Sequence, residues 1–211
     1  MIHIEDIMKN LSEKRPVFHS EADFQHALAW EIHETHPDFG IRLEGRIDIE
    51  KESFYVDMVV LKDGKMRYFI ELKYKTVVIN PKNKDEIYTI HGESFSLKNQ
   101  GARDVARYDF CKDIRRLEKI VEKKPESRGY AIFLTNDHLY WKHGRRNTND
   151  EKFKIHKDAV LNGTLRWGPN TGIGTMKGRE NEINLKNAYN IIWREYSDIE
   201  ESKFRYTFVE V

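Results

Sequence analysis

The first clear pattern along the chain is an apolar stripe at helical spacing that begins just after residue 20. Phe24, Leu28 and Ile32 recur every four residues and would lie on one face of a helix. Ser20 is placed to cap this helix, and Asp23 stands where the acid of a capping box would be. Proline and glycine follow shortly after the stripe, so we predict a helix that begins near residue 20 and ends before them.

Three stretches rich in strand-forming residues follow this helix. Residues 41–49 alternate apolar and polar positions, and residues 54–61 are dense in β-branched and aromatic side chains. Residues 66–74 form a third such run, separated from the second by Lys62-Asp63-Gly64. The pattern predicts three consecutive strands, with a tight turn between the last two.

A long helix and a fourth strand are predicted next. Polar residues 76–95 favour a loop, within which Glu86–Ile90 could form short regular structure. Residues from about 97 to 123 carry an apolar stripe at helical spacing, and YAIFL at 130–134 is typical of a buried strand. The stripe consists of Ala106, Phe110, Ile114, Leu117 and Val121.

The last third of the chain is less regular. Residues 137–181 are rich in glycine, asparagine and basic side chains. Residues 185–196 place apolar side chains at helical spacing, which predicts a helix, and residues 204–211 alternate like a closing strand.

These elements predict a single α/β domain over residues 1–211. Its core, about 20–136, would be a mixed β-sheet with helices on both faces. Residues from about 137 to 211 would form a C-terminal elaboration of this core.

Composition narrows the classes of partner and compartment. The 36 basic and 35 acidic side chains give a net charge of +1, so a nucleic-acid partner would have to meet a local basic patch. Cys111 is the one cysteine, which rules out an internal disulfide and suits a reducing compartment. The first 16 residues have no continuous apolar run, so we expect a cytoplasmic protein with no signal peptide and no membrane span.

Three charged residues interrupt the apolar runs of the second and third predicted strands. Asp57 lies within YVDMVVL, and Glu71 and Lys73 lie two residues apart within RYFIELKYK. Side chains alternate along a strand, so Glu71 and Lys73 share a face. Charges inside a sheet are costly unless they are paired or bind a metal ion. A divalent cation such as Mg²⁺ would account for the carboxylates, and the lysine could stabilise a developing oxyanion or help deprotonate water.

The acid-x-lysine pattern is common by itself. The chain contains five such triplets, and the one at Glu71 lies in an apolar run next to another run with an embedded acid. The alternative interpretation is an ion pair on a solvated sheet face, which would contribute little to stability. The other triplets begin at Asp63, Glu122, Asp150 and Glu201.

The order helix, three strands, helix, strand, with an acid on the second strand and acid-x-lysine on the third, resembles the PD-(D/E)XK nuclease superfamily, whose fold is restriction-endonuclease-like. The resemblance implies Mg²⁺ (or Mn²⁺) bound by Asp57, Glu71 and the carbonyl of Leu72, with Lys73 near the attacking water. Many members also carry a glutamate on the first helix, which Glu21 would match. The plain alternative for Glu21 is an acid favoured by the helix dipole.

Some features depart from that family. Val56 precedes the first acid where many members have proline. Gln100, a candidate for contact with nucleic acid or simply a polar surface residue, would share a face of the second helix with Asp104 and Tyr108, without the short glutamine-tyrosine motif of some members. Residues 137–211 match no family pattern.

Two segments combine basic, aromatic and glycine residues in a way that suits phosphate contacts. WKHGRR contributes Lys142, Arg145 and Arg146, and the glycine-rich segment 166–179 contributes Lys177 and Arg179. The alternative for both segments is a solvated surface loop.

The turn between the second and third strands decides whether Asp57 and Glu71 can meet. A two-residue loop without a bulge would direct Glu71 to the opposite face. A three-residue loop, 62–64, would pair Asp57 with Phe69 and put Glu71 on the same face as Asp57. We therefore predict this longer loop, with Gly64 at positive φ.

The sequence thus favours a Mg²⁺-dependent endonuclease that hydrolyses phosphodiester bonds, with DNA as the substrate that the resemblance implies. Two alternatives stay open: a catalytically inactive module of the same fold that binds nucleic acid or protein, and an RNA-cleaving defence or toxin effector. The resemblance also implies that the chain could act as a homodimer.

Overall fold

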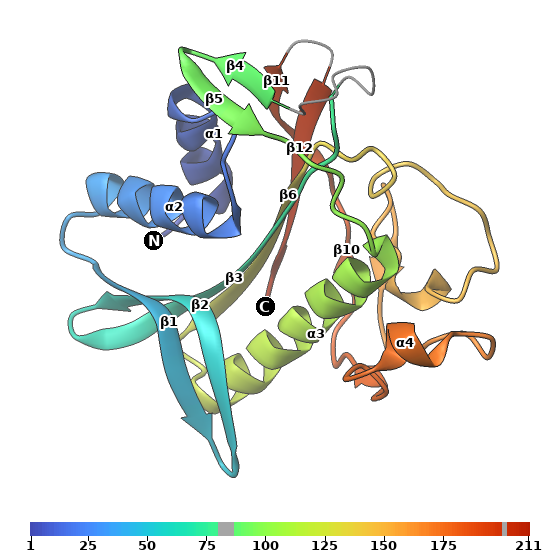
Figure 1. Ribbon diagram of the computed structural model, residues 1–211. Helices are drawn as coiled ribbons and strands as arrows, with labels where there is room; N and C mark the ends of the chain where they lie inside the picture. Colours follow the sequence, from blue (N-terminus) through green and yellow to red (C-terminus); the bar gives the residue numbers. More distant parts are fainter. Residues whose placement is uncertain (80–86, 200–201) are drawn as a thin grey trace.

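The computed structural model describes residues 1–79, 87–199 and 202–211. Within these residues the central element is a six-stranded mixed sheet in the order β1-β2-β3-β6-β12-β11 (Figure 1). Strands β3 and β6 are parallel, and the other neighbours in the sheet are antiparallel. The strands are β1 Gly40–Ile49, β2 Glu52–Lys62, β3 Lys65–Lys75, β6 Arg128–Thr135, β11 Arg194–Ile199 and β12 Ser202–Glu210.

Helices cover both faces of this sheet, as predicted. Helices α1 (Ile4–Lys14) and α2 (Glu21–Thr35) lie on one face, and α3 (Arg103–Lys123) lies on the other (Figure 1). The Ser20 side chain caps α2 by accepting from the Asp23 N–H at 3.1 Å, which confirms the predicted start. Helix α1 was not predicted, although Ile4, Ile7, Met8 and Leu11 have helical spacing and are all buried.

Two apolar cores result from this layering. One packs α1 and α2 against the sheet and includes Phe24, Leu28, Met58, Ile70 and Leu72. The other packs α3 and the C-terminal segment against the opposite face and includes Val59, Phe69, Phe110, Leu117 and Phe133. Charged residues of the sheet that face α3 therefore lie against a buried helix rather than in solvent.

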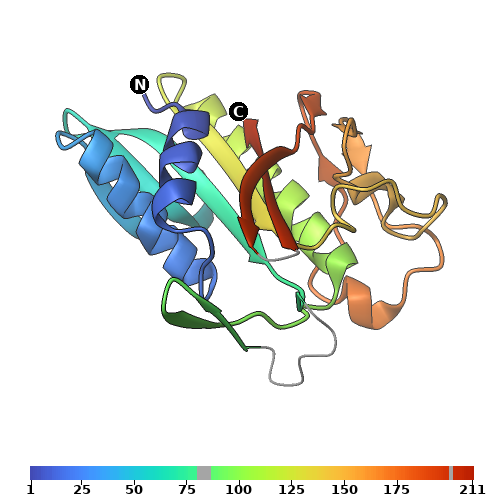
Figure 2. The same cartoon turned by 90° about the horizontal axis from the view of Figure 1, so that it is seen from above.

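The segment between β6 and β11 lies beside α3, on the opposite side of the molecule from α2 (Figure 2). The predicted helix over residues 185–196 is wrong. Leu185 and Ile191 are buried and donate backbone hydrogen bonds to Gly163 and Ala159, while Ile192 of the predicted stripe is 54% exposed. Long-range backbone pairing therefore replaces helical bonding here. The short elements are η1 Glu151–Phe153, β7 Val160–Leu161, β8 Thr164–Leu165, α4 Ile173–Met176, β9 Ile183–Asn184 and β10 Tyr189–Asn190.

The polar stretch after β3 contains a hairpin, so its prediction as a loop was partly wrong. Strands β4 (Ile87–Ile90) and β5 (Glu93–Ser96) pair antiparallel. The expected short structure at Glu86–Ile90 corresponds to β4, and Glu86 itself lies outside the described residues. Along the described ranges, no helix is long and apolar enough to cross a membrane.

The turn between β2 and β3 differs from the prediction. Asp63 and Gly64 form a two-residue loop, and their φ angles of 52° and 70° are both positive, as in a type I′ turn. The predicted three-residue loop, with Asp57 opposite Phe69, is wrong, whereas the positive φ of Gly64 is confirmed.

A β-bulge beside this turn restores the arrangement that the metal hypothesis needs. The register shifts by one residue, which makes Arg67 the extra residue of β3. Beyond the bulge Met58 pairs with Ile70, and the chain neighbours of these two residues on the side away from the turn are Asp57 and Glu71. The two acids can therefore face each other, because the bulge compensates for the shorter loop.

Candidate functional site

Strand β3 separates its apolar and charged side chains between the two faces of the sheet. Ile70, Leu72 and Tyr74 belong to the core under α1 and α2. Glu71 and Lys73 alternate with them and turn toward α3, so their predicted common face is confirmed by the cavity that both line. Glu71 is only 2% exposed, which makes it a deeply buried carboxylate.

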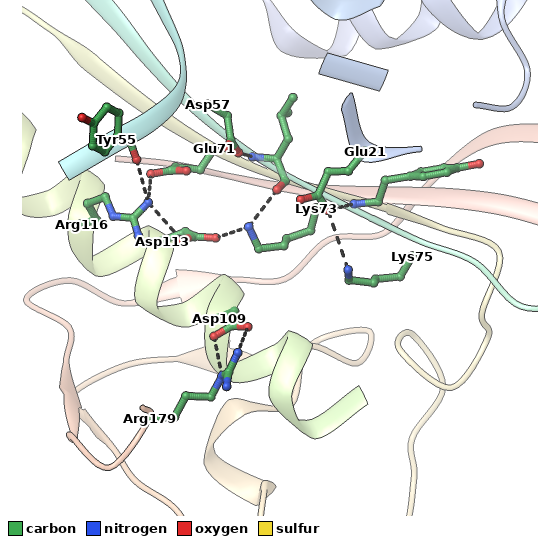
Figure 3. A network of polar contacts seen from close by, with 12 residues as sticks. Glu21, Tyr55, Asp57, Glu71, Lys73, Lys75, Asp109, Asp113, Arg116 and Arg179 are labelled. Atoms are coloured by element: carbon green, nitrogen blue, oxygen red, sulfur yellow. Dashed lines mark hydrogen bonds and ion pairs between the residues drawn. The ribbon is translucent and has the colours of Figure 1, made fainter. Parts of the chain in front are cut away.

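A polar cavity of about 340 Å³ lies between β2, β3, α2 and α3. Glu21, Asp57, Glu71 and Lys73, the residues predicted from the motif and the first helix, all line it (Figure 3). Glu21 thus lies at the cavity as well as in the first turn of α2. The other lining residues are Lys75, Ala106, Asp109, Lys112, Asp113 and Arg116.

Strand β2 leaves β3 at this cavity, and carboxylates take its place as hydrogen-bond acceptors. The pairing of β2 with β3 ends at Ile70, but the Leu72 and Tyr74 N–H groups still point toward that side. Asp57 Oδ2 accepts from Leu72 N at 2.6 Å, and Glu21 Oε2 accepts from Tyr74 N at 2.8 Å. Two acids from different elements are thus fixed along one edge of β3.

Two further contacts hold the backbone around these acids. Gln25, one turn after Glu21 on α2, is buried and donates its side-chain amide to the carbonyl of Asp57 at 2.5 Å. Lys73 Nζ donates to the carbonyl of Leu72 at 2.9 Å. The carbonyl that the family resemblance implies as a metal ligand is therefore next to the lysine.

Helix α3 contributes two residues that sequence reasoning missed. Asp113 is 5% exposed and pairs with Lys73 Nζ at 2.7 Å. Arg116 Nη1 lies 2.5 Å from Glu71 Oε1 and 3.5 Å from Asp113 Oδ1, as Figure 3 shows. A signal was present in the sequence, because Asp113 interrupts the buried stripe between Phe110 and Leu117.

Crowding of buried carboxylates makes their ionisation unfavourable. Burial, together with the nearby Asp113 and Asp57 carboxylates, raises the pKa of Glu71 to about 9, against the stabilising contact with Arg116. Burial also raises the pKa values of Asp57 and Asp113. The cluster therefore favours additional positive charge, either a bound proton or a cation.

The two cationic side chains of the cluster stay charged. Burial opposes charge on Lys73, but Asp113, Glu21 and Asp57 outweigh it and raise the pKa of Lys73 above its ordinary value. Burial likewise opposes charge on Arg116, and Glu71 and Asp113 raise its pKa. Lys73 therefore suits charge stabilisation rather than proton abstraction.

The donor chemistry fits a hard divalent cation. Asp57, Glu71 and the Leu72 carbonyl offer oxygen ligands, and Mg²⁺ is commonly bound by one or two carboxylates with water and phosphate. No group of three or more histidine, cysteine or acidic side chains that could hold a metal ion occurs in the described parts of the chain. The Arg116 guanidinium already contacts Glu71 Oε1, so it competes with a cation for the charge of that carboxylate.

Only some of the residues predicted to bind nucleic acid lie near the cavity. Arg179 reaches the rim of the cavity, since it makes a two-pronged ion pair with Asp109 at 2.8 and 2.9 Å. Gln100 lies before α3 and outside the cavity lining, where its backbone N–H donates to the Thr76 carbonyl and its side-chain amide to the Thr76 hydroxyl, and its contact with nucleic acid stays a prediction. Lys177 is exposed and directly follows α4.

The WKHGRR segment is not part of the cavity. Lys142 and Arg145 line a separate pocket at the start of α3, and Arg146 is exposed.

The other acid-x-lysine triplets have ordinary surroundings. Asp63 lies in the β2–β3 turn, Glu122 pairs with Lys186, and Asp150 pairs with Arg107. The triplet that begins at Glu201 starts outside the described residues. The Glu71 triplet thus differs from these three in lying at the cavity.

Comparisons of the chain with protein-family models, curated proteins and solved structures found no match. The chemistry of the cavity is what points to a function: buried acids with raised pKa values, a charged lysine, and a main-chain carbonyl beside them.

Proposed function

We propose that this chain is a Mg²⁺-dependent endonuclease that hydrolyses phosphodiester bonds in DNA, and that Mn²⁺ can replace Mg²⁺. The observation that carries the proposal is the convergence of Glu21, Asp57, Glu71 and Lys73 from α2, β2 and β3 on one polar cavity. Four residues that the sequence singles out line the same cavity, and the raised pKa values of Glu71 and Asp57 show that positive charge near these carboxylates would be favourable.

The order of elements supports a restriction-endonuclease-like core. Helix α2, strands β1, β2 and β3, helix α3 and strand β6 follow the order of the PD-(D/E)XK superfamily. In this proposal α1 precedes that core, and β11 and β12 extend its sheet past β6.

Asp57, Glu71 and the Leu72 carbonyl would hold the metal ion. When bound, such an ion supplies a nucleophilic water and neutralises charge on the phosphoryl group under attack. Lys73, held by Asp113 and protonated, is positioned to stabilise negative charge that develops on the phosphate. Glu21 and Gln25 fix Tyr74 and Asp57, and so maintain the spacing of the acids.

The test is a cleavage assay with plasmid, linear and branched DNA and with RNA, each with Mg²⁺, Mn²⁺ or EDTA. We expect metal-dependent cleavage of DNA that is lost in Asp57→Asn, Glu71→Gln and Lys73→Met. Glu122→Gln is the matched control, because it alters an exposed acid-x-lysine triplet paired with Lys186.

The outcomes also distinguish the alternatives. Cleavage of RNA alone would favour an effector that acts on RNA. Nucleic-acid binding without cleavage under any metal condition would favour an inactive binding module, in which Arg116 and Lys73 neutralise the acids permanently. Cleavage by the Asp57 or Glu71 variants at the wild-type rate would exclude this cavity as the active site.

A further inference from the structure

A second hollow, which we call the basic pocket, lies where the start of α3 meets residues 139–156. Its volume is about 180 Å³, too small for a nucleoside and large enough for a single phosphate group. The basic side chains that line it are Arg103, Arg107, Lys142, Arg145, Lys154 and His156.

Part of this positive charge is balanced within the protein. Arg103 pairs with Asp137, Arg107 pairs with Asp150, and Lys154 pairs with Glu151. Among the described residues, Lys142 and Arg145 have no acidic partner, so the basic pocket keeps an excess of positive charge. Such an excess over a small volume selects a compact anion.

A buried hydroxyl is the second, independent observation. Tyr140 lines the basic pocket and is 1% exposed, yet its hydroxyl has no hydrogen-bond partner within the described chain. Arg107 Nε is also buried without a partner there. Buried polar groups without partners are rare and costly, which indicates a ligand that completes them. Burial raises the pKa of Tyr140, so its hydroxyl remains a donor.

We propose that the basic pocket binds one phosphate group of a nucleic-acid strand, with Tyr140, Lys142 and Arg145 as its ligands. Arg107 of the pocket and Ala106 of the catalytic cavity are successive residues of α3, so the two hollows occupy adjacent faces of one helical turn. A phosphate held here would anchor the strand close to Glu71. The assignment of this phosphate to a nucleic acid rests on the proposed function. The preference of the basic pocket for phosphate rests only on the residues that line it.

The experiment measures binding in EDTA, where metal-dependent cleavage is off. Inorganic phosphate and single-stranded oligonucleotides with a 5′-phosphate or a 5′-hydroxyl are titrated into the full chain. Tyr140→Phe removes one hydroxyl that lacks a protein partner, so the fold should persist. We expect a loss of about tenfold in affinity in Tyr140→Phe and in Arg145→Gln. Lys152→Gln, which removes the charge of an exposed lysine of η1 outside the pocket lining, is the matched control.

The oligonucleotides identify the source of the phosphate. A terminal phosphate is assigned if only the 5′-phosphorylated strand loses affinity in the variants, and an internal phosphodiester if both strands do. Wild-type affinity for phosphate and for both oligonucleotides in Tyr140→Phe and Arg145→Gln overturns the proposal, even if cleavage is intact. Weakened phosphate binding in a chain that never cleaves DNA would retain the basic pocket and reject the nuclease.

Discussion

Replacing Arg116 with methionine tests the metal site most directly, because this guanidinium and a cation would compete for Glu71. Arg116 lies 2.5 Å from a carboxylate that is 2% exposed. Breaking a buried pair commonly costs about 3–5 kcal/mol when it leaves an uncompensated charge, and less where the remaining acid takes up a proton, as the raised pKa of Glu71 allows. The guanidinium here is 22% exposed, so we take about 3 kcal/mol, the lower end.

In a domain of this size that loss lowers the melting temperature by about 6–12 °C. A divalent cation should restore much of the lost stability, since a ligand at about 100 times its dissociation constant stabilises the folded state by about 2.7 kcal/mol. In the Arg116→Met variant the cation no longer competes with the guanidinium. We therefore expect Mg²⁺ or Mn²⁺ to raise the melting temperature of the variant by more than that of the wild type.

The assay is thermal unfolding in EDTA and in a series of metal concentrations. Arg115→Met is the matched control, because Arg115 is 23% exposed and pairs at 3.0 Å with the 2% exposed Glu118, outside the lining of the polar cavity. It should lose comparable stability in EDTA without a larger metal response. Equal metal responses in Arg116→Met, Arg115→Met and wild type would refute the competition.

Further predictions follow from the same residues. The pKa of Glu71 is raised from about 4.5 to about 9, so between these values the metal-free folded state holds a proton that the unfolded state has lost, and stability falls as pH rises. Glu71→Gln should therefore reduce the pH dependence of the free energy of unfolding, measured by chemical unfolding from pH 5 to 9. Metal affinity should rise with pH over the same range, because the cation replaces that proton, and calorimetry in buffers of different ionisation enthalpy should detect its release. Gly64→Ala should cost about 1 kcal/mol in urea unfolding, because its φ is 70°, and should not change metal affinity.

The features that sequence predicted well are those determined by a few neighbouring residues. The cap of α2 needs only Ser20 and the N–H three residues later, and the common face of Glu71 and Lys73 follows from strand alternation. Helix α1 shows the same kind of pattern and could have been predicted from it.

The features that sequence missed depend on contacts between distant segments. Residues 185–196 have helical spacing, but Leu185 is buried against α3 and its backbone bonds to Gly163, so tertiary pairing overrides the local pattern. The β-bulge at Arg67 changes the register without an obvious local signal. Arg116 pairs with a strand 45 residues earlier, which no periodicity reveals.

The departure of β2 from β3 explains why acids occupy this place at all. Leu72 and Tyr74 keep N–H groups directed to the vacated side, and Asp57 and Glu21 satisfy them. Each acid is therefore a structural hydrogen-bond acceptor for β3, whether or not it also contributes to a metal site. Alanine in place of either acid would remove the accepting oxygen together with the negative charge and leave a buried N–H unpaired. Asparagine at position 57 and glutamine at position 21 retain an accepting oxygen and remove the charge, so both variants should fold like the wild type. In a metal titration Asp57→Asn should lose affinity for the cation, whereas Glu21→Gln, which keeps the contact with Tyr74 and removes no proposed metal ligand, should largely retain it.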